Sequence, residues 1–224
     1  MSASRTLVFA LLPLFASCQV FKDQPSDAAS AEQVRLQGQL SQADGQLLFQ
    51  PCQEQRRFVI DDAGATDIMG ETAELLAGGP GPLFADVRGR LAASPQSGVD
   101  GQLKLERVYR LQHQGWGCDD PNFKRTTLHA SGQEPGWSVT VGGRGLVLER
   151  QGQQPLALPF LEEQLPEGRL NLSSEANGQR LELWVAPQRC VDPMSGAVQH
   201  LMAELRLNGE VLRGCGYYGG ARSD

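Results

Sequence analysis

The sequence predicts a mainly β protein built from two small antiparallel β-barrel or sandwich domains, with one short helix in the first. Apolar and polar residues alternate over most of the chain, which is the period of a half-buried strand. The 224 residues include 26 glycines and 13 prolines, which favour short strands joined by turns. We expect the first domain to cover residues 34–125 and the second residues 126–224.

The N-terminus predicts export and a lipid anchor. The apolar run from Thr6 to Ala16 is too short to span a bilayer, which takes about 20 residues, but it has the length of a signal-peptide core. It ends in Ala16-Ser17-Cys18, which resembles a bacterial lipobox, whose cysteine carries acyl chains such as palmitate after cleavage. We therefore expect residues 1–17 to be a lipoprotein signal peptide and Cys18 the lipid attachment site. An ordinary signal peptide with an incidental cysteine is the alternative.

The segment behind Cys18 predicts a location rather than a fold. Residues 18–33 are mostly polar and rich in Ala and Ser, which is typical of a flexible tether. Gln19 follows the cysteine, which by analogy with the sorting signal of enteric bacteria favours the outer membrane. The net charge of −6 and a pI near 5.2 argue against nucleic acid as a partner. We expect the domains to face the periplasm or the cell surface.

The first domain is predicted from four alternating segments and one helical one. Strands are expected over residues 34–40, 55–62, 82–93 and 102–114, and a change of alternation near Val108 indicates a bulge. The helical segment GETAELLAGG has Thr72 as its expected cap, Leu75 and Leu76 as inward residues and Gly78-Gly79 at its end. Strands around a short helix are compatible with a small closed or partly closed barrel.

The second domain is predicted as a series of hairpins. Residues 136–152 form one, and further strands are expected over residues 155–160, 169–174 and 179–186, where Leu181, Leu183 and Val185 share a face. The segment AELRLNGEVLRGC contains Asn208-Gly209, which suits the two positive-φ positions of a type I′ turn.

Four cysteines remain beside Cys18, namely Cys52, Cys118, Cys190 and Cys215. An even number in an exported chain implies disulfides, and four cysteines allow three pairings. If the two halves are separate domains, the pairs are Cys52–Cys118 and Cys190–Cys215. A zinc site is the rival interpretation, but the cysteines lack the close C-x2-C spacing of metal sites. We expect no metal and no cofactor.

Part of the first half resembles the OB-like domain of the NlpE outer-membrane lipoproteins. The shared positions form a Phe-x-x-Cys segment and three strand motifs, and here they are Phe49, Cys52, Phe58, Val87, Gly89, Leu105, Arg107, Val108 and Cys118. The resemblance implies an OB-like fold, supports the pairing of Cys52 with Cys118, and connects the chain with surface sensing and envelope-stress signalling. The copper motif of that family, C-x-x-C, is absent here, so the copper connection is not carried over.

A second resemblance covers residues 189–219. The pattern C-x-D-x-M-S, an alternating strand and then G-C-G is similar to the C-terminal part of an uncharacterised family of bacterial lipoproteins and predicted membrane proteins. That family implies a compartment and no established activity.

No candidate for catalysis or metal binding withstands comparison with its simpler alternative. Ser195 and His200 could be a nucleophile and base, but no G-x-S-x-G elbow is present, and Asp192-Pro193 and Ser195-Gly196 are good turn formers. The acidic pair Asp119-Asp120 lacks the spaced oxygen ligands of a calcium loop. The remaining candidates lack partners at suitable spacing; they are His113, His129, Asp61-Asp62 and Glu162-Glu163. We therefore expect no enzymatic activity.

Aromatic and loop residues supply a candidate binding surface, formed by Trp116, Asp192, Met194, Tyr217 and Tyr218. The alternative is that Trp116 covers a disulfide and the tyrosines cover a barrel end. We expect a non-enzymatic, lipid-anchored protein that binds or senses an envelope protein or a glycan at the periplasmic face of the outer membrane. A periplasmic inhibitor of a hydrolase, acting through loop 192–196 or 116–122, is the alternative function.

Overall fold

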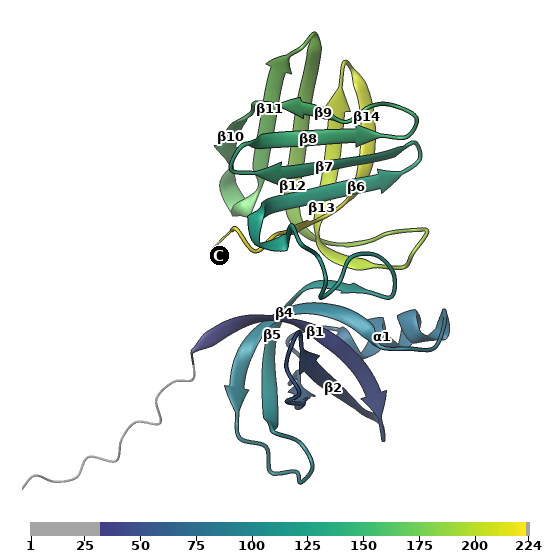
Figure 1. Ribbon diagram of the computed structural model, residues 1–224, viewed down its shortest axis with the longest axis vertical. Coiled ribbons are helices and arrows are strands. Elements are labelled where there is room, and N and C mark those ends of the chain that lie inside the picture. Colours follow the sequence, from purple (N-terminus) through teal and green to yellow (C-terminus); the bar gives the residue numbers. More distant parts are fainter. Residues whose placement is uncertain (1–31, 223–224) are drawn as a thin grey trace, which may run out of the picture. The chain divides into compact units, whose positions relative to one another are not determined.

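The computed structural model describes residues 32–222, and the predicted signal peptide, Cys18 and residues 19–31 of the predicted tether lie outside this range. The described chain is mainly β, with the elements labelled in Figure 1. Residues 31–224 form one compact unit, which contains two separate hydrophobic cores. No helix in the described range is long and apolar enough to cross a membrane.

The first core lies inside a closed five-stranded barrel with an OB-like arrangement, as expected. Its strands are β1 (Gln33–Ala43), β2 (Gln46–Pro51), β3 (Phe58–Asp61), β4 (Leu83–Ala92) and β5 (Gly101–Gln112). They pair in the order β1-β2-β3-β5-β4-β1, and only β3 and β5 run parallel among these five. The inward residues include Leu40, Phe58, Val87 and Leu103 of the predicted alternation, and also Phe49 of β2, a strand that lies outside the predicted segments. Closure removes the free strand edges that a five-stranded sheet would otherwise expose.

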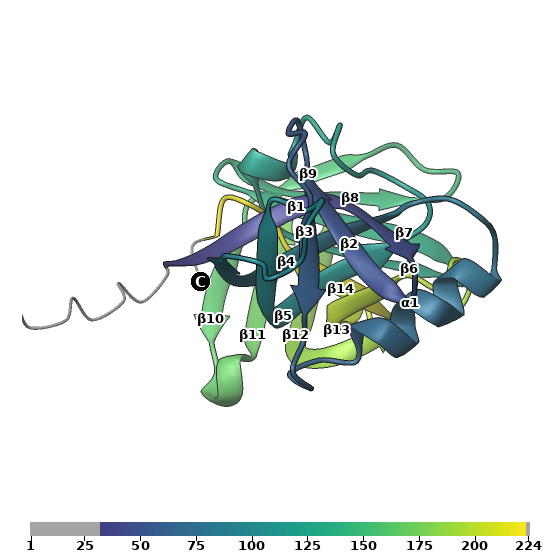
Figure 2. The same ribbon diagram turned by 90° about the horizontal axis from the view of Figure 1, so that it is seen from below.

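The helix α1 (Ile68–Ala77) packs against β4 and β5 and lies beside the barrel strands in Figure 2. Leu75 is buried and Gly78 ends the helix, as predicted. The predicted start at Thr72 is wrong, because the helix begins at Ile68 and Thr72 is buried inside it. A preceding turn sets the earlier start: the Thr66 hydroxyl donates to Asp62 and accepts from the Ile68 amide.

The predicted irregularity in β5 is confirmed. Its register against β4 shifts between Asp86 and Val87 and again between Arg88 and Gly89. As a result, the consecutive residues Tyr109, Arg110, Leu111 and Gln112 are all buried. Adjacent strand residues point to opposite faces, so this end of β5 is covered on both sides.

The C-terminal half, residues 126–222, is a single curled antiparallel sheet around the second core. Its strands are β6 (Thr126–Gln133), β7 (Gly136–Gly142), β8 (Gly145–Arg150), β9 (Leu156–Leu158), β10 (Leu161–Gln164), β11 (Leu170–Ala176), β12 (Gln179–Val191), β13 (Val198–Leu207) and β14 (Glu210–Tyr218). The order is β9-β8-β7-β6-β14-β13-β12-β11-β10. In Figure 1, β6 to β8 run crosswise to β11 to β14, and the apolar faces of both layers supply the core. A short 3-10 helix, η1 (Phe123–Arg125), precedes β6, and η2 (Pro166–Gly168) precedes β11.

Turn chemistry determines the tight hairpins. Asn208 and Gly209 have φ values of 51° and 91°, which confirms the predicted type I′ geometry. The same combination occurs at Asp44-Gly45, between β1 and β2, and at Asn177-Gly178, between β11 and β12. A residue with a short polar side chain followed by glycine tolerates positive φ at both positions, which fixes the register of each hairpin.

Both disulfides are those expected if each half holds its own pair. Cys52–Cys118 connects the segment after β2 to the loop after β5, and Cys190–Cys215 connects β12 to β14. The halves are also joined directly, because the end of β5 pairs with the start of β13 through Leu111 and Val198. Val198 packs in the barrel core although it belongs to the C-terminal half.

Candidate functional site

The structure divides the five predicted surface residues into two groups. Trp116 and Met194 are 65% and 73% exposed, whereas Asp192, Tyr217 and Tyr218 are buried. The tyrosines are therefore not on an open recognition surface: the Tyr217 ring packs on Arg110 of the barrel, and the Tyr218 ring lies in the second core. We call the contact between the barrel and the C-terminal half the junction and define it by Arg35, Asp86, Tyr109, Arg110, Tyr217 and Tyr218.

The Tyr217 ring is buried because it packs against the guanidinium of Arg110. This guanidinium lies 4.1 Å from the centre of the Tyr217 ring and 4.6 Å from the centre of the Phe84 ring, so it is held between two aromatic faces. On β6, His129 lies directly opposite Tyr217, with the ring centres 5.2 Å apart. A cation between aromatic rings, away from water, is a favourable arrangement for arginine.

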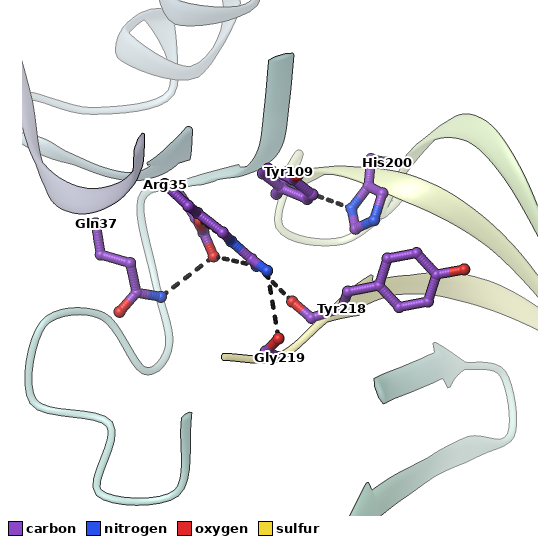
Figure 3. A network of polar contacts seen from close by, with 7 residues as sticks. Arg35, Gln37, Tyr109, His200, Tyr218 and Gly219 are labelled. Carbon is purple, nitrogen blue, oxygen red and sulfur yellow. Dashed lines mark hydrogen bonds and ion pairs between the residues drawn. The ribbon is translucent and has the colours of Figure 1, made fainter. Parts of the chain in front are cut away.

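Arg35 and Asp86 form the second part of the junction. Figure 3 shows Arg35 beside Tyr109 and the carbonyl groups of Tyr218 and Gly219. The Arg35 guanidinium donates to both Asp86 carboxylate oxygens, at 2.9 and 2.8 Å, and lies 4.0 Å from the centre of the Tyr109 ring. It also donates to the carbonyl oxygen of Tyr218 at 2.6 Å and to that of Gly219 at 3.3 Å. One arginine of β1 therefore joins β4 of the barrel to the end of β14.

The glycines around the tyrosines allow β14 to lie close to β6. A Cβ atom at Gly214 would collide with the carbonyl oxygen of Ser131, and one at Gly219 with that of Thr126. The glycines of the GCGYYGG segment thus allow the two backbones to approach closely, while the Tyr217 ring between them packs at the junction.

In loop 192–196, hydrogen bonds to the Asp192 carboxylate fix the backbone of Met194, while the Met194 side chain is exposed. One Asp192 carboxylate oxygen accepts from the Met194 and Ser195 amides, at 3.1 and 2.8 Å, and from the Ser195 hydroxyl at 2.8 Å. The other oxygen accepts from the Gln133 side chain at 3.2 Å. Burial raises the pKa of Asp192, but these hydrogen bonds outweigh it and hold the pKa below its usual value. The buried carboxylate therefore stiffens the loop whose tip is exposed.

Trp116 lies in the loop between β5 and η1. The Gln112 side chain donates to the Trp116 carbonyl oxygen at 2.8 Å, which fixes the backbone while the indole points to solvent. With about two thirds of its surface exposed, this indole adds little to packing over the nearby Cys52–Cys118 disulfide.

The candidate catalytic pair is not assembled. The Ser195 hydroxyl donates to Asp192, whereas His200 Nδ1 donates to the Tyr109 carbonyl oxygen at 2.9 Å. His113 donates to the Gly79 carbonyl oxygen at 3.1 Å. Within residues 32–222, no group of three or more His, Cys, Asp or Glu side chains is arranged to hold a metal ion.

We expect His129 to make stability depend on pH. Burial, helped by Arg110 and opposed by Asp120, lowers the pKa of His129 from its usual 6.5 to about 4. Between pH 6.5 and 4, His129 is protonated in the unfolded chain but neutral in the folded chain. The free energy of unfolding therefore falls as the pH drops through this window, and above pH 6.5 the full contribution of His129 is present. The loss is at most about 3 kcal/mol, measurable by urea unfolding at several pH values.

The matched variant for this effect is His129→Gln, which removes the titrating group and should flatten the pH dependence by the same amount. An NMR titration of the folded protein in which His129 protonates near 6.5 would contradict the expected pKa.

Trp184 is an exposed aromatic residue that the predicted binding surface does not include. Trp184 is 37% exposed on the outer face of β12 and borders two grooves. The signal was present, because a strand that directs Leu181, Leu183 and Val185 inward must direct Trp184 outward.

Comparison of the chain with protein-family models, with curated proteins and with solved structures found no match. The resemblances to the two lipoprotein families therefore stay predictions.

Proposed function

We propose that this is a non-enzymatic, lipid-anchored protein of the bacterial envelope that binds a partner protein through the exposed tip of loop 192–196, with Trp116 as a further contact. The observation that supports it most directly is Met194, a large apolar side chain that is 73% exposed on a stiffened loop. An apolar anchor on a preorganised loop loses little conformational entropy on binding.

Two features hold the loop independently of any partner. Cys190, two residues before Asp192, is linked to Cys215 of β14. In addition, two backbone hydrogen bonds close the loop: the Asp192 amide donates to the Ala197 carbonyl oxygen at 2.9 Å, and the Gly196 amide donates to the Asp192 carbonyl oxygen at 2.9 Å. The loop is therefore closed at its base and braced inside by one carboxylate.

The test is site-specific photo-crosslinking in intact cells. A benzophenone amino acid placed at position 194 or 116 should give one dominant crosslinked envelope protein. The matched control is position 211, where Val211 is also exposed but lies in the β13–β14 hairpin. Asp192→Ala should lower the yield at position 194 several-fold, because Met194 then loses its fixed orientation. Equal yields from positions 194 and 211 would contradict the proposal.

A hydrolase inhibitor is the second candidate, and the same stiff loop favours it. A rigid loop with an exposed side chain at its tip has the form needed to enter an enzyme cleft without being reordered. In that case the crosslinked partner is a hydrolase, and its activity falls in proportion to the fraction of hydrolase molecules that bind the purified chain. A partner without hydrolase activity excludes this candidate.

The anchor is tested separately. We expect an alkyne analogue of palmitate to label the wild-type protein, and Cys18→Ala to lose the label and to leave the membrane fraction, because the acyl chains supply the membrane affinity. Label that persists in Cys18→Ala would place the lipid elsewhere, and a wild-type protein without label would remove the anchor from the proposal.

A further inference from the structure

A groove of about 580 Å³ lies where β10, β11 and β12 meet the segment Pro159-Phe160, away from loop 192–196. Its volume falls within the range of about 300–1,000 Å³ that is usual for small-ligand sites. The side chains that line it include Phe160, Asn171, Ser174, Arg180, Glu182 and Trp184. It therefore combines an aromatic surface with several hydrogen-bonding groups.

Trp184 forms one wall of the groove. It lies opposite Asn171 on β11, and its Nε1 donates to Glu182 at 3.3 Å. The Arg206 guanidinium lies 5.6 Å from its ring centre, and Arg206 lines the neighbouring groove that Trp184 also borders. The indole is thus held in place between two grooves while more than a third of its surface stays exposed.

Two buried polar groups in the lining have no partner among the described residues, Nδ2 of Asn171 and the hydroxyl of Ser174. Asn171 is only 7% exposed. Buried polar atoms are nearly always hydrogen-bonded, since an unpaired one costs about 1–3 kcal/mol. Asn171 and Trp184 share the outer face of the sheet, whereas Ser174, opposite Leu181, faces the core. An unpaired amide donor beside an exposed indole is therefore suited to a ligand that carries its own hydrogen-bonding groups.

The charges of the groove select against an acidic ligand. Arg180 lies 3.6 Å from Glu175 and 3.5 Å from Glu182, so its charge is offset by two carboxylates, and Glu163 adds a third. The three carboxylates outnumber the one guanidinium, so the lining carries a net negative charge. This charge repels an acidic ligand. The carboxylates and the guanidinium still offer acceptors and donors to neutral hydroxyl and amide groups.

From these features we infer that the groove is a binding site for a neutral oligosaccharide. A sugar ring presents an apolar C–H face that packs on the electron-rich face of an indole. Its hydroxyl groups lie around the rim, where they reach the carboxylates, Arg180 and Asn171. The inference does not depend on the loop that carries the proposed partner contact.

An extended peptide fits the groove less well. Peptides commonly add as a strand to an open sheet edge, and β10 already covers residues 170–173 of β11. Only the last three residues of β11 extend beyond this pairing. The outer edge of β10 is four residues long and carries Glu162 and Glu163, which is typical of an edge protected against strand addition.

The test is calorimetric titration of the full chain, kept in a detergent without a sugar headgroup, with maltotriose, cellotriose and triacetylchitotriose. Trigalacturonic acid is the charged comparison. We expect one neutral trisaccharide to bind in the submillimolar range and the acidic one at least about tenfold more weakly. Trp184→Ala should weaken binding about tenfold or more. The matched control Trp116→Ala, at another exposed indole, should leave affinity unchanged.

A second variant separates recognition from folding. Asn171→Leu keeps the side-chain size and removes an amide donor that has no partner in the described chain, so we expect the unfolding midpoint to stay while affinity falls. No binding of the three neutral sugars at millimolar concentration overturns the inference, as does equal weakening by the Trp184 and Trp116 variants. If Trp184→Ala instead abolishes a protein crosslink while no sugar binds, the occupant is a polypeptide and the inference is wrong.

Discussion

Replacing Asp86 with alanine is expected to lower the free energy of unfolding by about 3–5 kcal/mol, the usual cost of breaking a buried ion pair by removing one partner. The Asp86 side chain is fully buried in β4, and it accepts from Arg35 through both oxygens and from Gln37 at 3.2 Å. Arg35 is mostly buried and would keep its charge without this carboxylate. Guanidinium chloride unfolding at pH 7 measures the loss.

The matched control is Glu204→Ala, which removes a partly exposed carboxylate that lies 2.9 Å from Arg206 and 3.5 Å from Arg213 and should cost about 1 kcal/mol or less. A double-mutant cycle with Arg35→Met isolates the coupling between the two side chains, expected at about 1–3 kcal/mol. If Asp86→Ala costs no more than the surface control, the ion pair does not hold the junction together.

The size of this effect follows from the position of Arg35. Its guanidinium contacts Asp86 in the barrel, the Tyr109 ring of β5 and two carbonyl oxygens at the end of β14. Loss of the carboxylate therefore acts on both halves of the chain, and we expect a single unfolding transition to shift rather than one half to unfold alone.

The parts of the fold that depend on nearby residues could be predicted from the sequence. Strand alternation, the Asn208-Gly209 turn and the irregularity near Val108 are local signals, because each depends on a few consecutive residues. The start of α1 is also a local signal, but the predicted cap Thr72 is not part of it: Asp62 and Thr66 form the preceding turn, and Thr72 lies buried inside the helix.

The parts that depend on distant contacts could not be predicted in the same way. Tyr217 and Tyr218 are adjacent on a strand and point to opposite faces, so both are buried only if both faces are covered. The second core covers Tyr218, whereas Arg110 of the barrel covers Tyr217. Nothing in the GCGYYGG segment indicates that a strand about a hundred residues earlier in the chain supplies that cover.

Removing the Cys52–Cys118 disulfide by a double alanine substitution is expected to cost about 4 kcal/mol, and removing Cys190–Cys215 about 3.5 kcal/mol. The order follows from the sequence separations of 66 and 25 residues, because a longer closed loop restricts the unfolded chain more. Both values are measured by guanidinium chloride unfolding of the oxidised proteins. The reverse order would show that native contacts at Cys190 and Cys215, rather than chain entropy, determine the effect.

The two disulfides should differ in their effect on partner contact even though their effects on stability are similar. Cys190 lies two residues before Asp192, so loss of its disulfide frees the base of the loop that presents Met194. We therefore expect Cys190→Ala/Cys215→Ala to reduce crosslinking from position 194 several-fold, at a temperature where the protein stays folded. The Cys52–Cys118 disulfide closes no part of that loop, so Cys52→Ala/Cys118→Ala should leave the crosslinking yield at position 194 unchanged. Equal reduction by both pairs would mean that general stability, and not the orientation of Met194, controls the contact.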